Sequence, residues 1–528
     1  MKIKSNTNFT TNQHELTRTI KKCRRPCSCA AKAAFYSCGL WLILLIFPLS
    51  LFAQQSAETS RRDTIMYGTD TEITNLIQAL KSENADYLYD ELINLAKTSG
   101  NMRVLSGIFA FFGEREKSGL EDRAMKAVSE RDNEANDTVS ASLDYLGRMK
   151  YAAAVDVIIE LLDTEERRFL SLGFRSLGRA GSADRSAGDK AAEFLIDFYS
   201  NRDPGADNRR ELIIAIGTTG STKGIEMLSE IAVNEDERIP LRTGALDALS
   251  KIGTADCVDA VLTCINTNDP NVRAAAVGAL GPFSGKEVDN AILEAFRDSY
   301  YRTRIAAVQA SRERKLVAAV PYLKYRAERD EVPNVREEAI RALGVIGNNE
   351  AVQILETLFT ERKNSDRIRI LSSEMVMKNA SSENITRIIA EMEEAKRRNQ
   401  TNLYSGFLRS LGLAVVTGDK TEMTNTAKRF LQAGNATEKL FALDMIANNN
   451  LTGINDDIEA LAADRNEGIA RKARRTLEIL EEFKSGRRQV RTTEQRTVSS
   501  EQRTENKEQR TKSNEQRTES NEQEEVIE

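Results

Sequence analysis

A short pattern recurs through the middle of the chain at intervals of about 31 residues. Five arginines mark it and lie 31, 31, 32 and 31 residues apart: Arg242, Arg273, Arg304, Arg336 and Arg367. In the first four copies an alanine follows the arginine after three residues. A unit of this length buries too little apolar surface to be stable alone, so it must stack against copies of itself. This periodicity constrains the fold more strongly than any other feature of the sequence.

The apolar part of the pattern extends toward both ends of the chain. It places further repeat positions at Ile73, Leu105, Val139, Leu170, Arg209, Tyr404, Lys439 and Ala470. Together with the five arginines, these positions predict about 13 units of roughly 31–39 residues, which is the size of a helical hairpin in a solenoid. The repeat region is predicted to span residues 70–484.

Each unit has the spacing of two amphipathic helices. In one first helix, apolar residues recur at helical intervals at Val335, Ala339, Ile340, Leu343 and Ile346. A second apolar segment follows at residues 351–359. Pro270 and Pro333 fall just inside the expected start of a helix, where the missing N–H costs nothing. No segment alternates apolar and polar residues long enough for a sheet. The sequence therefore predicts an all-α fold, a right-handed α-solenoid of stacked two-helix repeats.

Small residues are expected to let neighbouring repeats approach closely. Five glycines are each predicted to end a helix in the left-handed conformation: Gly147, Gly178, Gly217, Gly253 and Gly347. Stacked hairpins form a curved row with a large inner surface. We expect the second helix of each unit to line that surface.

The repeat resembles the HEAT repeats, and in particular the short subtype of the phycobilisome lyase-like (E/Z-type) proteins. The resemblance rests on Asp269-Pro270-x-Val272-Arg273, on Pro333-x-Val335-Arg336 and on the Ala-x-x-x-Leu-Gly that follows each. It covers residues 70–484 and implies a HEAT solenoid. It implies no single function, because this architecture hosts many roles, and no residue can be tied to a lyase activity.

The first 53 residues have the order of an export signal. Basic residues precede an apolar run at residues 39–52, and Ala53 offers a small residue for cleavage. The alternative is an uncleaved signal anchor, because residues 33–53 are uncharged over a length just sufficient to cross a bilayer. Pro48 favours cleavage. Both alternatives predict export to the periplasm or cell envelope. An uncleaved leader would be the one contact with the inner membrane, and residues 54–69 would be a linker.

The charge of the chain argues against a nucleic-acid partner. The net charge is −5, but residues 1–53 hold eight basic residues and one acidic residue, so the remainder has a net charge of −12. Binding to nucleic acid requires a positive field that displaces the phosphate counterions. A protein or peptide partner is expected instead.

The repeat region lacks the motifs of known catalytic and metal sites. The single histidine, His14, lies in the leader. Its position excludes Ser-His-Asp and Cys-His catalysis and the His-Glu iron sites of HEAT-like proteins similar to deoxyhypusine hydroxylase. Residues 217–224 resemble a phosphate-binding loop, but the lysine is misplaced. Cys257 and Cys264 are expected to be buried small side chains without a disulfide. We therefore expect no cofactor, no metal and no enzyme activity.

The best candidate for a binding surface is a stretch rich in tyrosine and basic residues. It comprises Arg297, Tyr300, Tyr301, Arg302, Tyr322, Lys324, Tyr325 and Arg326. Tyrosine and arginine are enriched in interface hot spots because they combine large contact area with polar tips. The alternative is a structural role, since Asp298 and Asp330 are interleaved and Arg304 is itself a repeat position.

Residues 485–528 contain a seven-residue repeat built on Glu-Gln-Arg-Thr. No position of that repeat is regularly apolar, so it has no coiled-coil seam. A highly charged segment with almost nothing to bury is predicted to be disordered. A flexible tether and a duplication without function both explain it.

These observations predict a non-catalytic protein-binding or assembly scaffold of the cell envelope that acts through its inner surface. The alternatives are a histidine-independent lyase or hydrolase-like enzyme and a binder of an anionic polymer. The inner surface distinguishes them: a deep pocket with converging carboxylates indicates an enzyme, a basic aromatic groove an anionic polymer, and a broad mixed surface a protein. The sequence makes no prediction about the oligomeric state.

Overall fold

The computed structural model describes residues 58–83, 87–378 and 380–486. Its contacts divide the chain into two compact units, residues 1–149 and 150–528. In unit 1, residues 58–67 are helical, although the sequence placed them in a linker. The helices that follow are α2 (Asp70–Ser82), α3 (Tyr89–Thr98), α4 (Met102–Glu114), α5 (Glu121–Ser129) and α6 (Asn136–Arg148).

Unit 2 consists of α7 to α26, with short 3-10 turns before some helices. The even-numbered helices are α8 (Arg167–Gly181), α10 (Ala206–Thr218), α12 (Ile239–Ile252), α14 (Pro270–Ala279), α16 (Tyr301–Glu313), α18 (Pro333–Ile346), α20 (Asp366–Met377), α22 (Thr401–Leu413), α24 (Ala436–Asn449) and α26 (Glu467–Lys484). The odd-numbered helices are α7 (Ala154–Leu162), α9 (Arg185–Asn201), α11 (Ile225–Val233), α13 (Val258–Cys264), α15 (Lys286–Ala295), α17 (Val320–Arg329), α19 (Asn349–Thr360), α21 (Ser382–Arg397), α23 (Thr421–Ala433) and α25 (Asn455–Leu461).

The all-α solenoid predicted from the sequence is confirmed. Across the three described ranges no β-strand forms, and a single isolated parallel bridge joins Ala380 to Val416. Most of the apolar stripe predicted for residues 335–346 is buried as expected: Val335, Ala339, Ile340 and Leu343 are fully excluded from solvent in α18, whereas Ile346 at the end of the helix is only partly buried. The predicted helix starts are also confirmed, because Pro270 and Pro333 begin α14 and α18.

Twelve of the 13 predicted repeat positions occupy the same place in the fold. Each is the fourth residue of an even-numbered helix, from Ile73 in α2 to Ala470 in α26. The exception is Arg367, which is the second residue of α20, whereas Arg369 is the fourth. Arg369 is 4% exposed, while the Arg367 side chain is 72% exposed. The buried arginine of this repeat is therefore Arg369, and the prediction for Arg367 is wrong by two residues.

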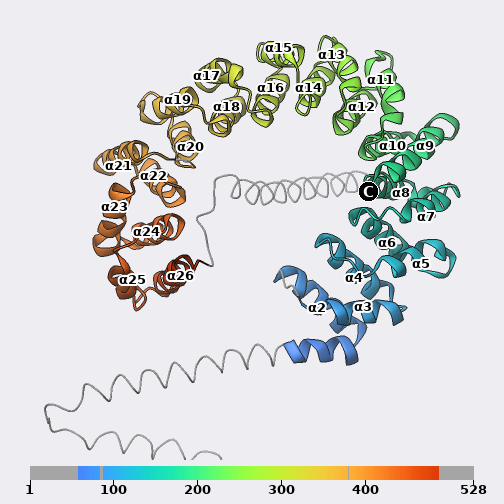
Figure 1. Cartoon of the computed structure of the whole chain (residues 1–528), viewed down its shortest axis with the longest axis horizontal. Coiled ribbons are helices and arrows are strands. Elements are labelled where there is room, and N and C mark those ends of the chain that lie inside the picture. The colour runs from blue at the N-terminus through green and yellow to red at the C-terminus, as the bar shows by residue number, and fades with distance from the viewer. Residues whose placement is uncertain (1–57, 84–86, 379, 487–528) are drawn as a thin grey trace, which may run out of the picture. The chain divides into compact units, whose positions relative to one another are not determined.

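Within unit 2 the even-numbered helices form one layer and the odd-numbered helices form another (Figure 1). Successive even-numbered helices contact each other more extensively than successive odd-numbered helices do. The row of helices in this unit therefore bends toward the even-numbered layer. This layer contains the first helix of each predicted repeat, so the prediction that the second helices line the inner surface is wrong.

Glycine allows the even-numbered helices to approach closely. A Cβ on Gly217 of α10 would lie 2.4 Å from the Cα of Ala248 in α12. A Cβ on Gly178 of α8 would lie 2.7 Å from the carbonyl oxygen of Ala215 in α10. Both contacts are shorter than a real Cβ tolerates, and both involve backbone atoms that cannot swing away. These two glycines lie inside helices, so their predicted role as left-handed helix ends is wrong.

Left-handed residues do end other even-numbered helices. Gly253 follows α12 with φ of 68° and Gly347 follows α18 with φ of 62°, as predicted. Gly147 lies inside α6, so the prediction fails there. Lys315 takes the left-handed conformation after α16, with φ of 48°. A residue with a Cβ is disfavoured in this region, so this turn stores local strain.

Candidate functional site

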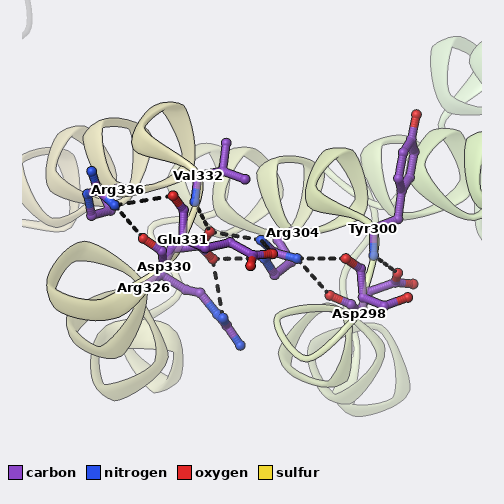
Figure 2. Close-up of polar contacts among 9 residues, drawn as sticks. Asp298, Tyr300, Arg304, Arg326, Asp330, Glu331, Val332 and Arg336 are labelled. Carbon is purple, nitrogen blue, oxygen red and sulfur yellow. Dashed lines mark hydrogen bonds and ion pairs between the residues drawn. The ribbon is translucent and has the colours of Figure 1, made fainter.

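A buried ion pair joins two successive repeats in the centre of unit 2 (Figure 2). Nε and Nη2 of Arg304 in α16 donate to the two carboxylate oxygens of Asp330, which follows α17, both at 2.8 Å. The side chains are 4% and 0% exposed, respectively. Nη1 of Arg304 donates to the carbonyl oxygens of Asp298 and Ser299, at 3.1 and 2.9 Å. The guanidinium is thus surrounded by acceptors from the connections that flank its own repeat.

Asp330 serves the next repeat as well. Its Oδ1 accepts the backbone N–H of Val332 at 3.0 Å, directly before α18, and its Oδ2 accepts Nη1 of Arg326 at 3.2 Å (Figure 2). Burial alone would raise the pKa of Asp330, but the hydrogen bonds from Arg304 and Val332 outweigh it and hold the pKa below its usual value. The carboxylate is therefore ionised and fully engaged in holding the helix start.

The preceding repeat contains the same arrangement. Nε and Nη2 of Arg273 in α14 donate to Asp298 at 2.8 and 3.2 Å. Nη1 of Arg273 donates to the carbonyl oxygens of Thr267 and Asn268. Asp298 in turn accepts the backbone N–H of Tyr300 at 2.7 Å, at the start of α16. As for Asp330, these hydrogen bonds outweigh the effect of burial and lower the pKa of Asp298.

We call this series the arginine ladder: Arg242, Arg273, Arg304, Arg336 and Arg369, each the fourth residue of its helix. Arg242 and Arg369 are each 4% exposed and donate through Nε to a carbonyl oxygen ten residues earlier, at 3.0 and 2.8 Å. Nη1 of Arg336 donates to the carbonyl oxygen of Asp330. The ladder therefore ties each of these five even-numbered helices either to the connection that precedes it or to the last turn of the preceding odd-numbered helix.

Beyond α20 other residue types fill the same positions. Lys439, the fourth residue of α24, pairs with Asp464 at 3.3 Å. Tyr404, the fourth residue of α22, donates its hydroxyl to Glu438. The Glu438 side chain is 4% exposed and also accepts Nζ of Lys396 at 2.8 Å. The fourth residue of these helices thus still carries a polar donor that binds an acidic side chain farther along the chain, although the residue types change.

The ladder is structural, because each of its arginines donates to acceptors within the protein. The sequence identified the arginines but treated Asp298 and Asp330 as charges interrupting a binding surface. A usable signal was present: each aspartate lies six residues before the next ladder arginine, immediately before a helix. This spacing marks a residue that can both cap a helix and bind the preceding arginine.

A second feature of unit 2 is the solvent-facing surface of its even-numbered helices. We call this surface the even-helix face. Ion pairs connect successive helices across it: Arg175–Glu211 at 2.8 Å, Arg312–Glu338 at 3.5 Å, Arg367–Glu337, Arg409–Glu374 at 2.8 Å and Lys472–Asp444 at 2.6 Å. Each pair combines one positive and one negative side chain. The even-helix face is consequently balanced in charge along much of its length.

Apolar side chains lie between these ion pairs. Leu413, at the end of α22, is 58% exposed. Partly exposed apolar side chains lie on other helices of the same layer: Leu172, Ile214, Val345, Ile370, Leu440 and Phe441. A surface that mixes apolar side chains with paired charges has the composition of a protein interface that is not permanently occupied.

The predicted tyrosine- and arginine-rich surface is distributed over both layers. Tyr300 and Tyr301 lie at the start of α16, with ring centroids 5.5 Å apart, and Arg302 donates to the Tyr301 hydroxyl at 3.2 Å. The other residues lie on or beside the odd-numbered layer. Arg297, in the turn after α15, stacks over Tyr322 of α17 at 5.7 Å, and Lys324, Tyr325 and Arg326 lie on α17.

The contacts between the predicted residues therefore form three separate groups. One is Tyr300, Tyr301 and Arg302; the second is Arg297 with Tyr322; the third is Tyr325 with Arg326, whose guanidinium lies 5.1 Å from the ring centroid. Within the part of the chain that the structure describes, none of these contacts joins one group to another. Whether these residues bind a partner stays a prediction.

The remaining candidates occupy structural positions. Cys257 and Cys264 are buried free thiols, as the sequence predicted, and the Cys264 thiol donates to the carbonyl of Ala232 at 3.3 Å. Burial raises the pKa of Cys264. In the phosphate-loop-like stretch, Lys223 forms an ion pair with Glu193. The two cysteines therefore belong to the packing of unit 2, whereas Lys223 lies in an exposed ion pair.

A shallow hollow of about 510 Å³ lies at the start of α23, lined by Gly418, Asp419, Lys420, Thr421, Thr424 and Asn425. Within residues 58–83, 87–378 and 380–486, no three histidine, cysteine or carboxylate side chains are placed to hold a metal ion. Over the same ranges, every helix is too short or too polar to cross a bilayer. The apolar run at 39–52 lies outside the described residues.

Two solved structures illustrate the similarity of this chain to known folds, both at low identity and low TM-score. An engineered protein is 14% identical and aligns over 74% of this chain and 98% of its own, with a TM-score of 0.30. The karyopherin Kap121p is 10% identical over 80% of this chain and 53% of its own, with a TM-score of 0.41. This chain thus spans about half the length of Kap121p. No curated protein matches it.

One protein family matches most of the chain. The family described as Spirochaete HEAT repeat protein aligns with residues 65–476. This range includes the arginine ladder and helices of both units. The match agrees with the stacked helical pairs of the structure and with the HEAT resemblance predicted from the sequence. The chain belongs to the Spirochaete HEAT repeat protein family.

Proposed function

We propose that this protein is a non-catalytic scaffold that binds a protein partner along the even-helix face of unit 2. The observation that carries the proposal is the composition of that face. Its charged side chains are paired between neighbouring helices, and partly exposed apolar side chains lie between the pairs. Such a surface suits a polypeptide that offers both apolar and charged side chains, because many modest contacts can form on successive helices.

The composition of the face favours a protein over the two alternatives. An anionic polymer would require an excess of positive charge, whereas the arginines of this face are matched by glutamates. An enzyme would require a pocket in which titratable groups converge, whereas the face presents separate ion pairs on successive helices. The phycobilisome lyase-like subtype suggested by the sequence has no supporting residue on this face.

The proposed location is the cell envelope, reached by export through the leader at residues 1–53. This part of the proposal rests on the order of basic residues, apolar run and Ala53 in the sequence. It is tested by fractionation of cells that make the full chain and by sequencing the N-terminus of the isolated protein. A mature N-terminus directly after Ala53 would support cleavage. Recovery in the cytoplasm would contradict export.

The binding proposal is tested by site-specific photo-crosslinking in cells that make the protein. A benzophenone side chain would replace Gln309 on α16 or Ser405 on α22, two exposed residues of the even-helix face. Matched control positions are Thr263 on α13 and Asn425 on α23, exposed residues of odd-numbered helices. We expect discrete protein adducts from the first pair alone. Adducts only from the control pair, or none from Gln309 and Ser405, would contradict the proposal.

A further inference from the structure

A second exposed surface lies on the odd-numbered layer, along α17 and the turn before it. We call it the α17 stripe: Val317, Pro321, Lys324, Tyr325, Glu328 and Arg329, all of them exposed. Residues 321, 324, 325, 328 and 329 are three or four positions apart, so they share one side of the helix. Val317 is 55% exposed and Tyr325 is 52% exposed. The side chains of Val317 and Tyr325, both of low polarity, are thus exposed to solvent eight residues apart.

Two guanidinium groups stack against the tyrosine of the α17 stripe: that of Arg329, a member of the stripe, and that of its neighbour Arg326. The guanidinium carbons of Arg326 and Arg329 lie 5.1 and 5.7 Å from the Tyr325 ring centroid. Stacking of this kind orients a guanidinium and leaves its N–H groups available at the edge. Arg326 also binds Asp330 at 3.2 Å. Among the described residues, Lys324 and Arg329 have no ion pair, and Glu328 is the one acidic member of the stripe.

Several other basic side chains on the odd-numbered layer are paired with acidic neighbours. Arg387 pairs with Glu383 at 2.7 Å, and Arg429 pairs with Glu393 at 2.7 Å. After α9, Arg202 pairs with Asp163 at 2.8 Å. The chain outside residues 1–53 has a net charge of −12. The α17 stripe places two basic side chains without an ion pair in the described part of the chain, and one acidic side chain, around an exposed tyrosine, so it is complementary to an acidic ligand.

We propose that the α17 stripe binds an acidic, extended segment of a partner protein. Lys324 and Arg329 are separated by about 7.5 Å along the helix axis. Two carboxylates that are two residues apart on an extended chain are separated by about 7 Å and point the same way. The two carboxylates of such a segment bind Lys324 and Arg329, and an aliphatic side chain farther along it packs against Tyr325 and Val317. This surface is separate from the even-helix face, so the proposal extends the proposed function.

Fluorescence polarisation with a defined probe tests the proposal on the full chain. The probe is a labelled peptide in which two glutamates and a leucine alternate with serines, and its counterpart carries lysines in place of the glutamates. We expect the acidic peptide to bind and the basic one not to bind, with affinity falling as salt rises. The double substitution Lys324→Glu with Arg329→Glu should weaken binding roughly tenfold or more, and Tyr325→Ala should weaken it several-fold.

The matched control reverses two exposed lysines elsewhere that have no ion pair among the described residues, Lys97 on α3 and Lys428 on α23. The control variant should bind the acidic peptide within about twofold of the original chain, because general electrostatic attraction is screened over distance. Equal loss in the control would overturn the proposal, as would absence of binding. Displacement of the peptide by a single-stranded oligonucleotide, with the same loss in the Lys324 and Arg329 variant, would assign the stripe to nucleic acid instead. Unchanged circular dichroism confirms that each variant folds.

Discussion

Arg304 lies in the first helix of one repeat and Asp330, 26 residues later, lies in the connection to the next repeat, yet the two form a two-pronged ion pair from which solvent is almost completely excluded. A buried pair of this kind contributes little net stability compared with apolar residues of similar size, because both charges are removed from water. Removing one partner of the pair is strongly destabilising, because the remaining charge is left buried without a partner. The ladder therefore specifies how neighbouring repeats are aligned more than it adds to their stability.

Removing the aspartate alone should destabilise unit 2 strongly. We expect Asp330→Ala to lower the free energy of unfolding by about 3–5 kcal/mol, because it leaves the Arg304 guanidinium buried and uncompensated. The double substitution Arg304→Met with Asp330→Leu should recover most of that loss. Urea denaturation followed by circular dichroism measures both. As a control, Glu374→Ala breaks a pair with the half-exposed Arg409 and should cost less than about 1 kcal/mol. Equal losses in Asp330→Ala and Glu374→Ala would refute the distinction.

The ladder also predicts how stability depends on pH. The pKa values of Asp298 and Asp330 are lowered, because hydrogen bonds from Arg273, Arg304 and the next helix start outweigh burial. A carboxylate with a lowered pKa in the folded state stabilises the fold above its unfolded pKa of about 3.9 and loses this contribution as pH falls toward the folded value. We expect the melting temperature to be steady near neutral pH and to fall below about pH 4.

The variant Asp298→Asn with Asp330→Asn provides the comparison for the pH series. It should melt at a lower temperature than the original chain at neutral pH, because the charged hydrogen bonds are weakened. Its melting temperature should then change less on acidification, because two titrating groups are gone. If both proteins lose stability in parallel as the pH falls, other carboxylates dominate the acid transition.

Close packing of the even-numbered layer predicts opposite effects for two glycine-to-alanine substitutions. Gly217→Ala should destabilise by about 1–3 kcal/mol, because its Cβ would overlap the Ala248 backbone. Gly278→Ala in α14 should stabilise by about 1 kcal/mol, because nothing lies within 4 Å of the added methyl group and alanine favours the helix. Thermal unfolding of the two variants decides the matter. Similar effects from both would mean that helix propensity, not close approach, governs these positions.

A substitution in the turn after α16 should stabilise the protein. Lys315 has φ of 48°, in the left-handed region that glycine adopts without strain. Lys315→Gly should therefore stabilise the protein by about 1 kcal/mol. The reverse change, Gly253→Ala after α12, should cost about 1 kcal/mol, because φ there is 68°. A loss of stability in Lys315→Gly would show that side-chain contacts of the lysine exceed the strain.

The sequence predicted the repeat positions well because those residues are defined by local helical spacing. Ile73 and Ala470, at opposite ends of the series, both occupy the fourth place of an even-numbered helix. The choice of inner layer could not be predicted in this way. It depends on contacts such as that between Gly217 and Ala248, in which small residues on two helices must coincide in space.

Long-range pairing limited the prediction of polar sites. Arg369 was missed because Arg367 fits a regular period, although solvent exclusion selects the former. The acidic members of the ladder were missed because their arginine partners lie 25 or 26 residues away. The predicted tyrosine-rich surface illustrates the same limit. Its members are close in sequence, but helix boundaries distribute them over α16, α17 and the turn between α15 and α16.

Asp298 and Asp330 each make two kinds of contact, and this restricts how a chain of this type can change length during evolution. Each carboxylate neutralises the arginine behind it and anchors the helix ahead of it. Duplication or loss of genetic material in steps of one full period leaves every such acid between an arginine and a helix start. An insertion or deletion of only part of a period would instead move the acid away from its arginine or from the helix start. Selection would therefore tolerate whole-period insertions anywhere in this series and reject partial ones.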